Sequence, residues 1–165
     1  MKILYSLLLT AILTTSCGVY SFTGASIPNE AETVSVAYFT STVTNFPATL
    51  NQTITEGLRD LLLSQTNLNL IESNGDLNFS GKITKYHIKP MAIQANETAS
   101  KNRLTISVQI EYKNTIDKSQ DFESTFSRYR DFNSSENLDD VESILIEEIT
   151  EELLEDVFNK AFVNW

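Results

Sequence analysis

Several short stretches in the middle of the chain have apolar residues at every second position. Alternation of this kind is typical of a β-strand with one buried face. In the first stretch Val34, Val36 and Tyr38 share one parity and are expected to face the core. In the third stretch the apolar positions change parity near Thr84, which predicts a β-bulge. The predicted strands cover residues 33–39, 68–71, 77–89, 103–113 and 121–132.

Two other stretches have apolar residues at helical spacing. The first begins at Phe46–Pro47, where Pro suits the first turn of a helix, and runs to about Ser64. Its apolar stripe consists of Leu50, Ile54, Leu58, Leu61 and Leu62. The second covers residues 138–162 and has several acids near its start, where they favour the positive end of the helix dipole. Its expected core face consists of Leu138, Val141, Leu145, Ile149 and Leu153.

The order of these elements is strand, helix, several strands and helix. Helices and sheets are stable when they bury their apolar faces against each other. We therefore predict a single α+β domain over residues 33–165, with two helices packed on one face of a mostly antiparallel sheet. Asn74–Gly75–Asp76 is predicted to be a turn, and the polar residues 90–102 a loop.

The start of the chain has the layout of a bacterial secretory signal. Lys2 precedes an apolar run over residues 3–13, which is shorter than the ~20 residues that a membrane-spanning helix needs. The residues Thr14–Thr15–Ser16–Cys17 resemble a lipobox, although Thr14 stands where Leu is usual. We predict a lipoprotein signal peptide over 1–16, lipidation of Cys17 by diacylglycerol and acyl chains, and an extended leader over 17–32. Gly18 stands where an inner-membrane retention signal has Asp, which indicates the outer membrane.

Composition excludes several classes of function. The formal net charge is -10, whereas nucleic-acid-binding proteins hold phosphates with clustered Lys and Arg. One Cys and one His leave no disulfide framework, zinc site or Cys/His catalytic pair. His87 has no nucleophile or carboxylate motif to act with, so we assign no catalytic residue. We expect a protein that is not an enzyme, uses no metal or further cofactor and does not bind nucleic acid.

Basic residues are concentrated in the predicted strands. Residues 76–132 carry nine bases and seven acids, whereas the rest of the chain after Cys17 carries two bases and fifteen acids. If the strands pair in hairpin order, one end of the sheet gathers Lys85, His87, Lys89, Arg103, Arg128 and Arg130. Such a cluster could hold the phosphate or carboxylate groups of an anionic ligand.

Two interpretations of these basic residues remain open. Arg128 and Arg130 share parity with Phe122, Phe126 and Phe132, and a lipid with phosphates would suit such a mixed face. Alternatively, the charges are solvated or protect a sheet edge. The choice depends on the register, because a slip of one residue moves a set of side chains to the other face.

The second helix carries a run of acids. These are Glu147, Glu148, Glu151, Glu152, Glu155 and Asp156. They lack the alternating spacing and central Gly of a calcium-binding loop, so we interpret them as a solvated helix face and predict no metal site.

Motifs in the mature chain resemble those of the LPS-assembly lipoproteins (LptE-like), in the form found in Bacteroidota-type bacteria. The resemblance covers essentially the whole mature chain. It is carried by Cys17 to Gly24 with Ala25 to Pro28, Thr33 to Val36 continuing to Phe39, Gly75–Asp76–Leu77, Gly81 to Thr84 with Tyr86 and Pro90, Asn102 to Ile106, and Phe158 to Ala161 with Asn164–Trp165.

The resemblance implies a non-enzymatic outer-membrane lipoprotein with two helices on a sheet of about four strands. Such a protein sits as a plug in the lumen of a large β-barrel translocon, helps the barrel assemble and assists lipopolysaccharide delivery to the outer leaflet. The implied partners are this barrel, the membrane that holds the lipid anchor, and lipopolysaccharide or lipooligosaccharide. The resemblance also implies lipopolysaccharide binding through basic and aromatic residues, for which Lys85, Arg128 and Arg130 are the candidate contacts. Two alternatives stay open: a lipid-anchored accessory subunit of an uptake or secretion complex, and a lipid-acting or cell-wall enzyme.

Overall fold

The computed structural model describes residues 27, 28, 30–91 and 100–163. The predicted signal peptide, Cys17, most of the leader, the centre of the 90–102 loop and Asn164–Trp165 lie outside the described residues. The elements in chain order are β1 (Thr33–Val36), β2 (Thr40–Ser41), α2 (Leu50–Gln65), β3 (Asn69–Ile71), β4 (Leu77–Pro90), β5 (Lys101–Asn114), the 3-10 turn η1 (Lys118–Gln120), β6 (Phe122–Asn133) and α3 (Leu138–Phe162).

The described strands form one mixed sheet in the order β3-β1-β4-β5-β6, with the short β2 beside β4. The long strands β4, β5 and β6 pair in antiparallel hairpin order. By contrast, β1 runs parallel to both β3 and β4. The predicted α+β class is confirmed, and the sheet is wider than the expected four strands.

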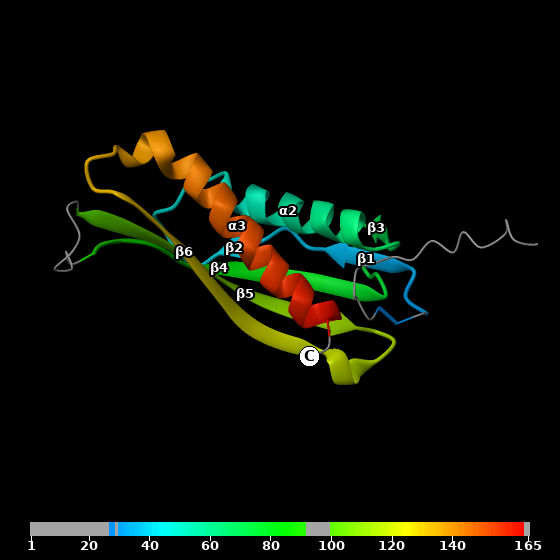
Figure 1. Ribbon diagram of the computed structural model, residues 1–165. Coiled ribbons are helices and arrows are strands. Elements are labelled where there is room, and N and C mark those ends of the chain that lie inside the picture. The colour runs from blue at the N-terminus through cyan, green and yellow to red at the C-terminus, as the bar shows by residue number, and fades with distance from the viewer. Residues whose placement is uncertain (1–26, 29, 92–99, 164–165) are drawn as a thin grey trace, which may run out of the picture.

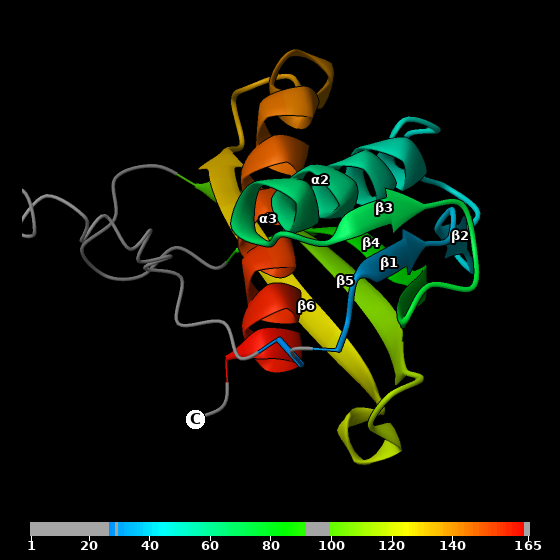
Figure 2. The same cartoon turned by 90° about the vertical axis from the view of Figure 1, so that its right-hand side faces the viewer.

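Both helices lie on one face of this sheet (Figure 1). The helix α2 contacts β1 and β3, and α3 crosses β5 and β6 and also contacts α2. In the view turned by 90°, no helix of the described residues lies over the opposite face (Figure 2). We call this second side the open face. The core therefore lies between the helix pair and the sheet.

The helix α3 covers the predicted range, and its buried face is wider than expected. Leu145, Ile149 and Leu153 are buried as predicted, while Leu138 and Val141 are half-buried. Further residues are buried because α3 packs against α2 as well as the sheet; they are Ile146, Leu154, Val157, Phe158 and Phe162. On α2, the stripe is confirmed at Leu50, Ile54, Leu58 and Leu62, with Leu61 half-buried.

The prediction for the first strand was wrong at its end. The strand β1 stops at Val36, and Tyr38 is 56% exposed although it shares parity with the buried Val34 and Val36. Phe39 is fully buried instead, and its backbone N–H donates to Thr55 Oγ1 at 3.1 Å. This bond to α2 accompanies the burial of the fully apolar Phe39 ring, while the Tyr38 side chain with its hydroxyl stays exposed.

Other boundaries differ by a few residues. The helix α2 begins at Leu50 because Pro47 lies in a turn closed by the Leu50 N–H donating to the Pro47 carbonyl at 3.0 Å. The strands β4 and β5 extend into both ends of the predicted 90–102 loop. The bulge near Thr84 is confirmed, because the register between β4 and β5 shifts between Ile83 and Lys85. Asn74 in the predicted turn has a φ of 58°, a left-handed conformation that Asn tolerates.

Candidate functional site

The sheet register divides the six basic residues between its two faces. Residues paired across antiparallel strands point to the same face. Arg128 pairs with Ile106 and Arg130 with Leu104, and both partners are fully buried beneath the helices. Lys85 pairs with Ser107, which follows Ile106 on β5 and points to the opposite face of the sheet. Lys85 therefore lies on the open face. Lys85 thus occupies the same half of the sheet as Arg128 and Arg130 but the opposite side of it.

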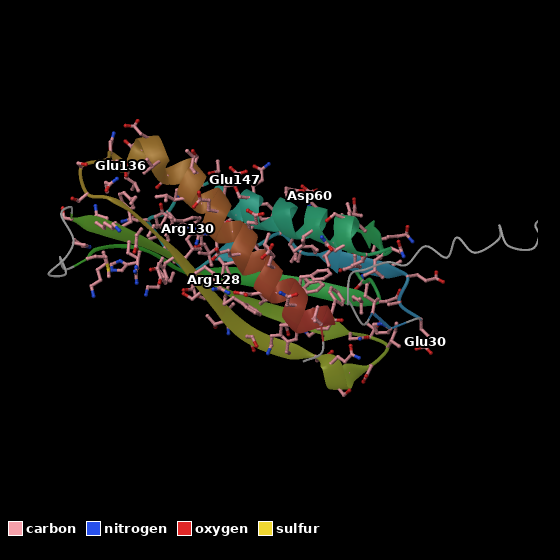
Figure 3. The ribbon with its side chains drawn as sticks, in the orientation of Figure 1. Glu30, Asp60, Arg128, Arg130, Glu136 and Glu147 are labelled. Atoms are coloured by element: carbon pink, nitrogen blue, oxygen red, sulfur yellow. The ribbon has the colours of Figure 1, made fainter. Side chains whose placement is uncertain are left out.

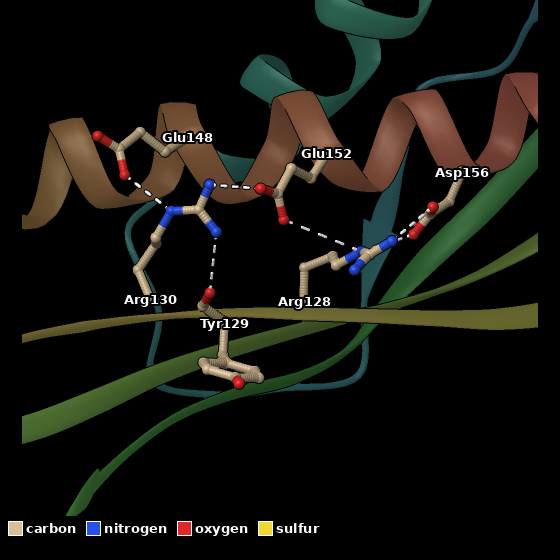
Figure 4. A network of polar contacts seen from close by, with 6 residues as sticks. All are labelled: Arg128, Tyr129, Arg130, Glu148, Glu152 and Asp156. Atoms are coloured by element: carbon tan, nitrogen blue, oxygen red, sulfur yellow. Dashed lines mark hydrogen bonds and ion pairs between the residues drawn. The ribbon is translucent and has the colours of Figure 1, made fainter.

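Arg128 and Arg130 are held by carboxylates of α3 (Figure 4). Arg128 donates two hydrogen bonds to Asp156, both at 2.7 Å. Arg130 donates to Glu148 Oε2 at 2.8 Å and to Glu152 Oε1 at 2.6 Å. Together these five residues form a network, here called the β6–α3 clamp, that joins the edge strand β6 to α3.

Hydrogen bonding in the clamp stabilises the charged forms of its members. The hydrogen bonds that Arg130 donates to Glu152 and Glu148 raise the pKa of Arg130 above its usual value. The hydrogen bond from Arg130 lowers the pKa of Glu152. The pKa of an arginine is already far above neutrality, so Arg128 and Arg130 remain charged at ordinary pH. Its energetic contribution is moderated by solvent, since the Arg128 side chain is 44% exposed.

The clamp corrects part of the interpretation of the helical acids. Glu148, Glu152 and Asp156 bind arginines of the sheet and are not a purely solvated face. The sequence spacing already indicated two matching sets of charges. Acids at intervals of four share one face of a helix, and arginines at an interval of two share one face of a strand. Pairing the two sets needed the docking of α3 on β6, which the sequence did not predict.

The predicted mixing of aromatic and cationic groups on β6 is confirmed, and this face points toward α3. Phe132 is 7% exposed, and Phe122 and Phe126 pack partly buried against the core. The phenyl rings are therefore largely packed against the protein core. A lipid would have to displace α3 to contact the whole of this face.

The open face carries the remaining basic residues. Lys85, His87 and Lys89 are exposed and lie on this side of β4. Across β5, Arg103 donates to both carboxylate oxygens of Asp131 at 2.7 and 2.8 Å, and its guanidinium lies 3.7 Å from the centre of the Tyr129 ring. Among the described residues, Lys85 and Lys89 have no ion-pair partner. They are the cations of this group that are available to an anionic ligand.

Two searches of the described residues bear on other classes of site. No group of three or more His, Cys, Asp or Glu side chains there could hold a metal ion. Within the same residues, neither helix combines the length and the apolar character needed to cross a membrane.

Solved structures of bacterial proteins share this fold at low sequence identity. A minor lipoprotein from Acinetobacter baumannii is 14% identical, with a TM-score of 0.52 over 79% of this chain and 91% of its own. A hypothetical protein from Chlamydia trachomatis is 10% identical, with a TM-score of 0.53 over 81% of this chain and 99% of its own. A putative neuraminyllactose-binding hemagglutinin homolog from Helicobacter pylori is 7% identical, with a TM-score of 0.53 over 84% of this chain and 87% of its own.

The sequence comparisons are more specific. No curated protein matches the chain closely enough to count as a relative. The family model described as LptE, lipopolysaccharide-assembly, matches residues 31–161. This range contains every described strand, all of α2 and all of α3 except its last residue, Phe162. The chain therefore belongs to the LptE lipopolysaccharide-assembly family.

Proposed function

We propose that this protein is a non-enzymatic outer-membrane lipoprotein that plugs a β-barrel lipopolysaccharide translocon, helps the barrel assemble and assists lipopolysaccharide delivery to the outer leaflet. The observation that carries the proposal is the family match over nearly the whole folded domain. The physics is compatible with it, because large outer-membrane barrels have polar lumens that a plug can fill. A compact domain with a polar open face and an acidic helix pair suits such a polar environment.

The proposed anchor is Cys17, the single cysteine of the chain. More than one acyl chain is needed for stable membrane attachment, since each buried CH2 contributes ~0.8 kcal/mol. Growth of cells with radiolabelled palmitate should label the wild-type protein and leave the Cys17→Ser variant unlabelled. Label on the variant would show that the lipid is attached elsewhere.

We propose that lipopolysaccharide phosphates contact Lys85 on the open face. Lys85 is exposed and, within the described part of the chain, not engaged by a carboxylate. The companion hypothesis for Arg128 and Arg130 requires a phosphate to displace the acids of the β6–α3 clamp. The three-residue hypothesis therefore has an open-face part, Lys85, and a clamp part, Arg128 and Arg130.

Binding of purified lipid A to three variants separates these parts. Lys85→Gln is expected to weaken binding about tenfold, the loss of one charge-assisted contact. The matched control is Lys113→Gln, whose amine pairs with Glu111 at 2.8 Å at the far end of β5. The double variant Arg128→Gln/Arg130→Gln tests the clamp part. Unchanged affinity of Lys85→Gln, with an intact circular dichroism spectrum, would remove Lys85 from the site.

Depletion of the protein tests the cellular role. The proposal predicts that lipopolysaccharide fails to reach the cell surface, measured by surface labelling of intact cells. Normal surface lipopolysaccharide after depletion would instead favour an accessory subunit of another outer-membrane complex.

A further inference from the structure

A groove of about 630 Å³ runs between α2 and α3 on the side away from the sheet. Its apolar lining includes Leu61, Leu154 and Gly57. The helices approach closely here, since a Cβ on Gly57 would lie 2.8 Å from Leu154 Cδ1. Asp60 of α2 and Glu147 of α3 point away from the sheet above this crossing (Figure 3).

The rim of the groove is acidic on both sides. Glu147, Glu151 and Glu155 follow one another at intervals of four on α3, and Asp60 faces them from α2. All four side chains are exposed, and no Lys or Arg lines the groove. We call these four residues and the apolar floor between them the acidic groove.

Like charges at this helical spacing repel each other, so the rim costs the free protein stability. The other side of α3 shows how the chain compensates such charge, because Glu148, Glu152 and Asp156 are paired with arginines of the sheet. On the groove side the described residues supply no counter-charge. A cation from another molecule would relieve the repulsion.

A second observation comes from the lining of the groove. Thr150 is one of the residues that line it and is only 3% exposed. Its Oγ1 atom has no hydrogen-bond partner in the described structure. An unpaired buried hydroxyl costs free energy, so this wall of the groove is incompletely hydrogen-bonded within the described part of the protein.

We propose that the acidic groove docks a Lys- or Arg-bearing segment of the partner barrel's lumen wall. This inference rests on the proposed function and adds the face by which the plug is held. The apolar floor accepts the methylene stems of such side chains, while their charged ends reach the carboxylates on the rim. A small divalent ion fits less well, because no three acids of the described part converge as metal ligands.

The test uses the full, natively lipidated chain in outer membranes. A photocrosslinking amino acid is placed at Asp60 or Glu151 in the groove, and at Tyr129 on the open face for comparison. Crosslinked peptides are mapped by mass spectrometry. The inference predicts that the groove positions join the barrel at segments containing Lys or Arg.

A matched pair of charge variants completes the test. Glu147→Gln/Glu151→Gln/Glu155→Gln should lower the affinity for the barrel about tenfold, since three ion pairs are lost. Glu30→Gln/Glu72→Gln/Glu123→Gln removes the same charge from exposed positions outside the groove and should leave copurification unchanged. Misfolding cannot mimic the expected loss, because removal of the repulsion should leave the groove variant at least as heat-stable as wild type.

The outcomes separate the two proposals. If no translocon barrel copurifies with the wild-type chain, the proposed function is wrong, and this inference is wrong with it. If the barrel copurifies equally with both triple variants and crosslinks only from Tyr129, the proposed function survives and the docking face is wrong.

Discussion

At the scale of single residues, two positions in the family-like motifs have clear physical roles. Gly81 leaves room for the buried ring of Phe39, since a Cβ on Gly81 would lie 2.6 Å from Phe39 Cε1 and 2.8 Å from the Gln109 carbonyl oxygen. Asp76 ties the start of β1 to the start of β4. Its Oδ2 accepts hydrogen bonds from the Thr33 backbone N–H at 2.9 Å and from Thr33 Oγ1 at 2.7 Å.

Gly81→Ala is expected to destabilise the fold by about 1–3 kcal/mol, the usual range for an overpacked core. The reason is that backbone on one side and a buried ring on the other leave the added methyl no space. Urea denaturation of the purified domain measures the change. Ser80→Ala, at the neighbouring half-buried position on the open face, is the control; it loses one hydrogen bond to Glu111 but adds no volume, so it should cost less than Gly81→Ala. A Gly81→Ala variant as stable as wild type would show that Phe39 does not pack as described.

Asp76→Asn tests the pH dependence of this junction. The hydrogen bonds from Thr33 and Glu32 lower the pKa of Asp76 below its ordinary 3.8. A carboxyl with a lowered folded-state pKa stabilises the protein above the unfolded value, and this contribution is lost as pH falls through the folded value. The Tm difference between wild type and Asp76→Asn should therefore be full at neutral pH and shrink below about pH 3.8. A difference that is constant with pH would contradict the ionised contact.

At the scale of elements, α3 docks by two kinds of contact. Its apolar face covers the sheet and α2, and its acids hold β6 through the β6–α3 clamp. Among the described strands, the edge strand β6 pairs with β5 alone, so the clamp and the phenyl rings that face the core provide its other attachment. We therefore expect the clamp to affect local opening of β6 more than global unfolding.

Arg130→Gln is expected to cost about 1 kcal/mol, because partly exposed ion pairs are individually weak even in a network. The loss should shrink in 0.5 M salt through screening, and amide exchange along β6 should accelerate more than along β4. The control is Arg59→Gln on α2, whose partners, Glu56 and the Val36 carbonyl, both lie outside β6. Equal exchange rates in β6 of wild type and Arg130→Gln would mean that the clamp does not hold the strand.

Periodicity predicted the element types well, because α3 and the long strands have uninterrupted patterns. It failed at Tyr38 and Phe39, where a contact with α2 decides which ring is buried. It also could not assign Arg128, Arg130 and Lys85 to faces. The bulge at Thr84 shifts the pairing of β4 with β5 by one residue. Counting odd and even positions therefore does not show which residues of β4 share a face with those of β6.

At the scale of the whole molecule, charge is distributed by face. The open face carries exposed cations at one end of β4, and the outer side of the helices carries the acidic groove. The two proposals above assign a role to each surface. The open face would meet the phosphates of the transported lipid, while the acidic groove would hold the plug in its barrel.

The most direct test of this account is purification of the tagged, lipidated protein from outer membranes in mild detergent, with mass spectrometry of everything that remains bound. The account predicts the β-barrel of the lipopolysaccharide translocon in near-equal amount to the tagged chain. Recovery of a different outer-membrane complex, or of no barrel, would contradict the proposed function.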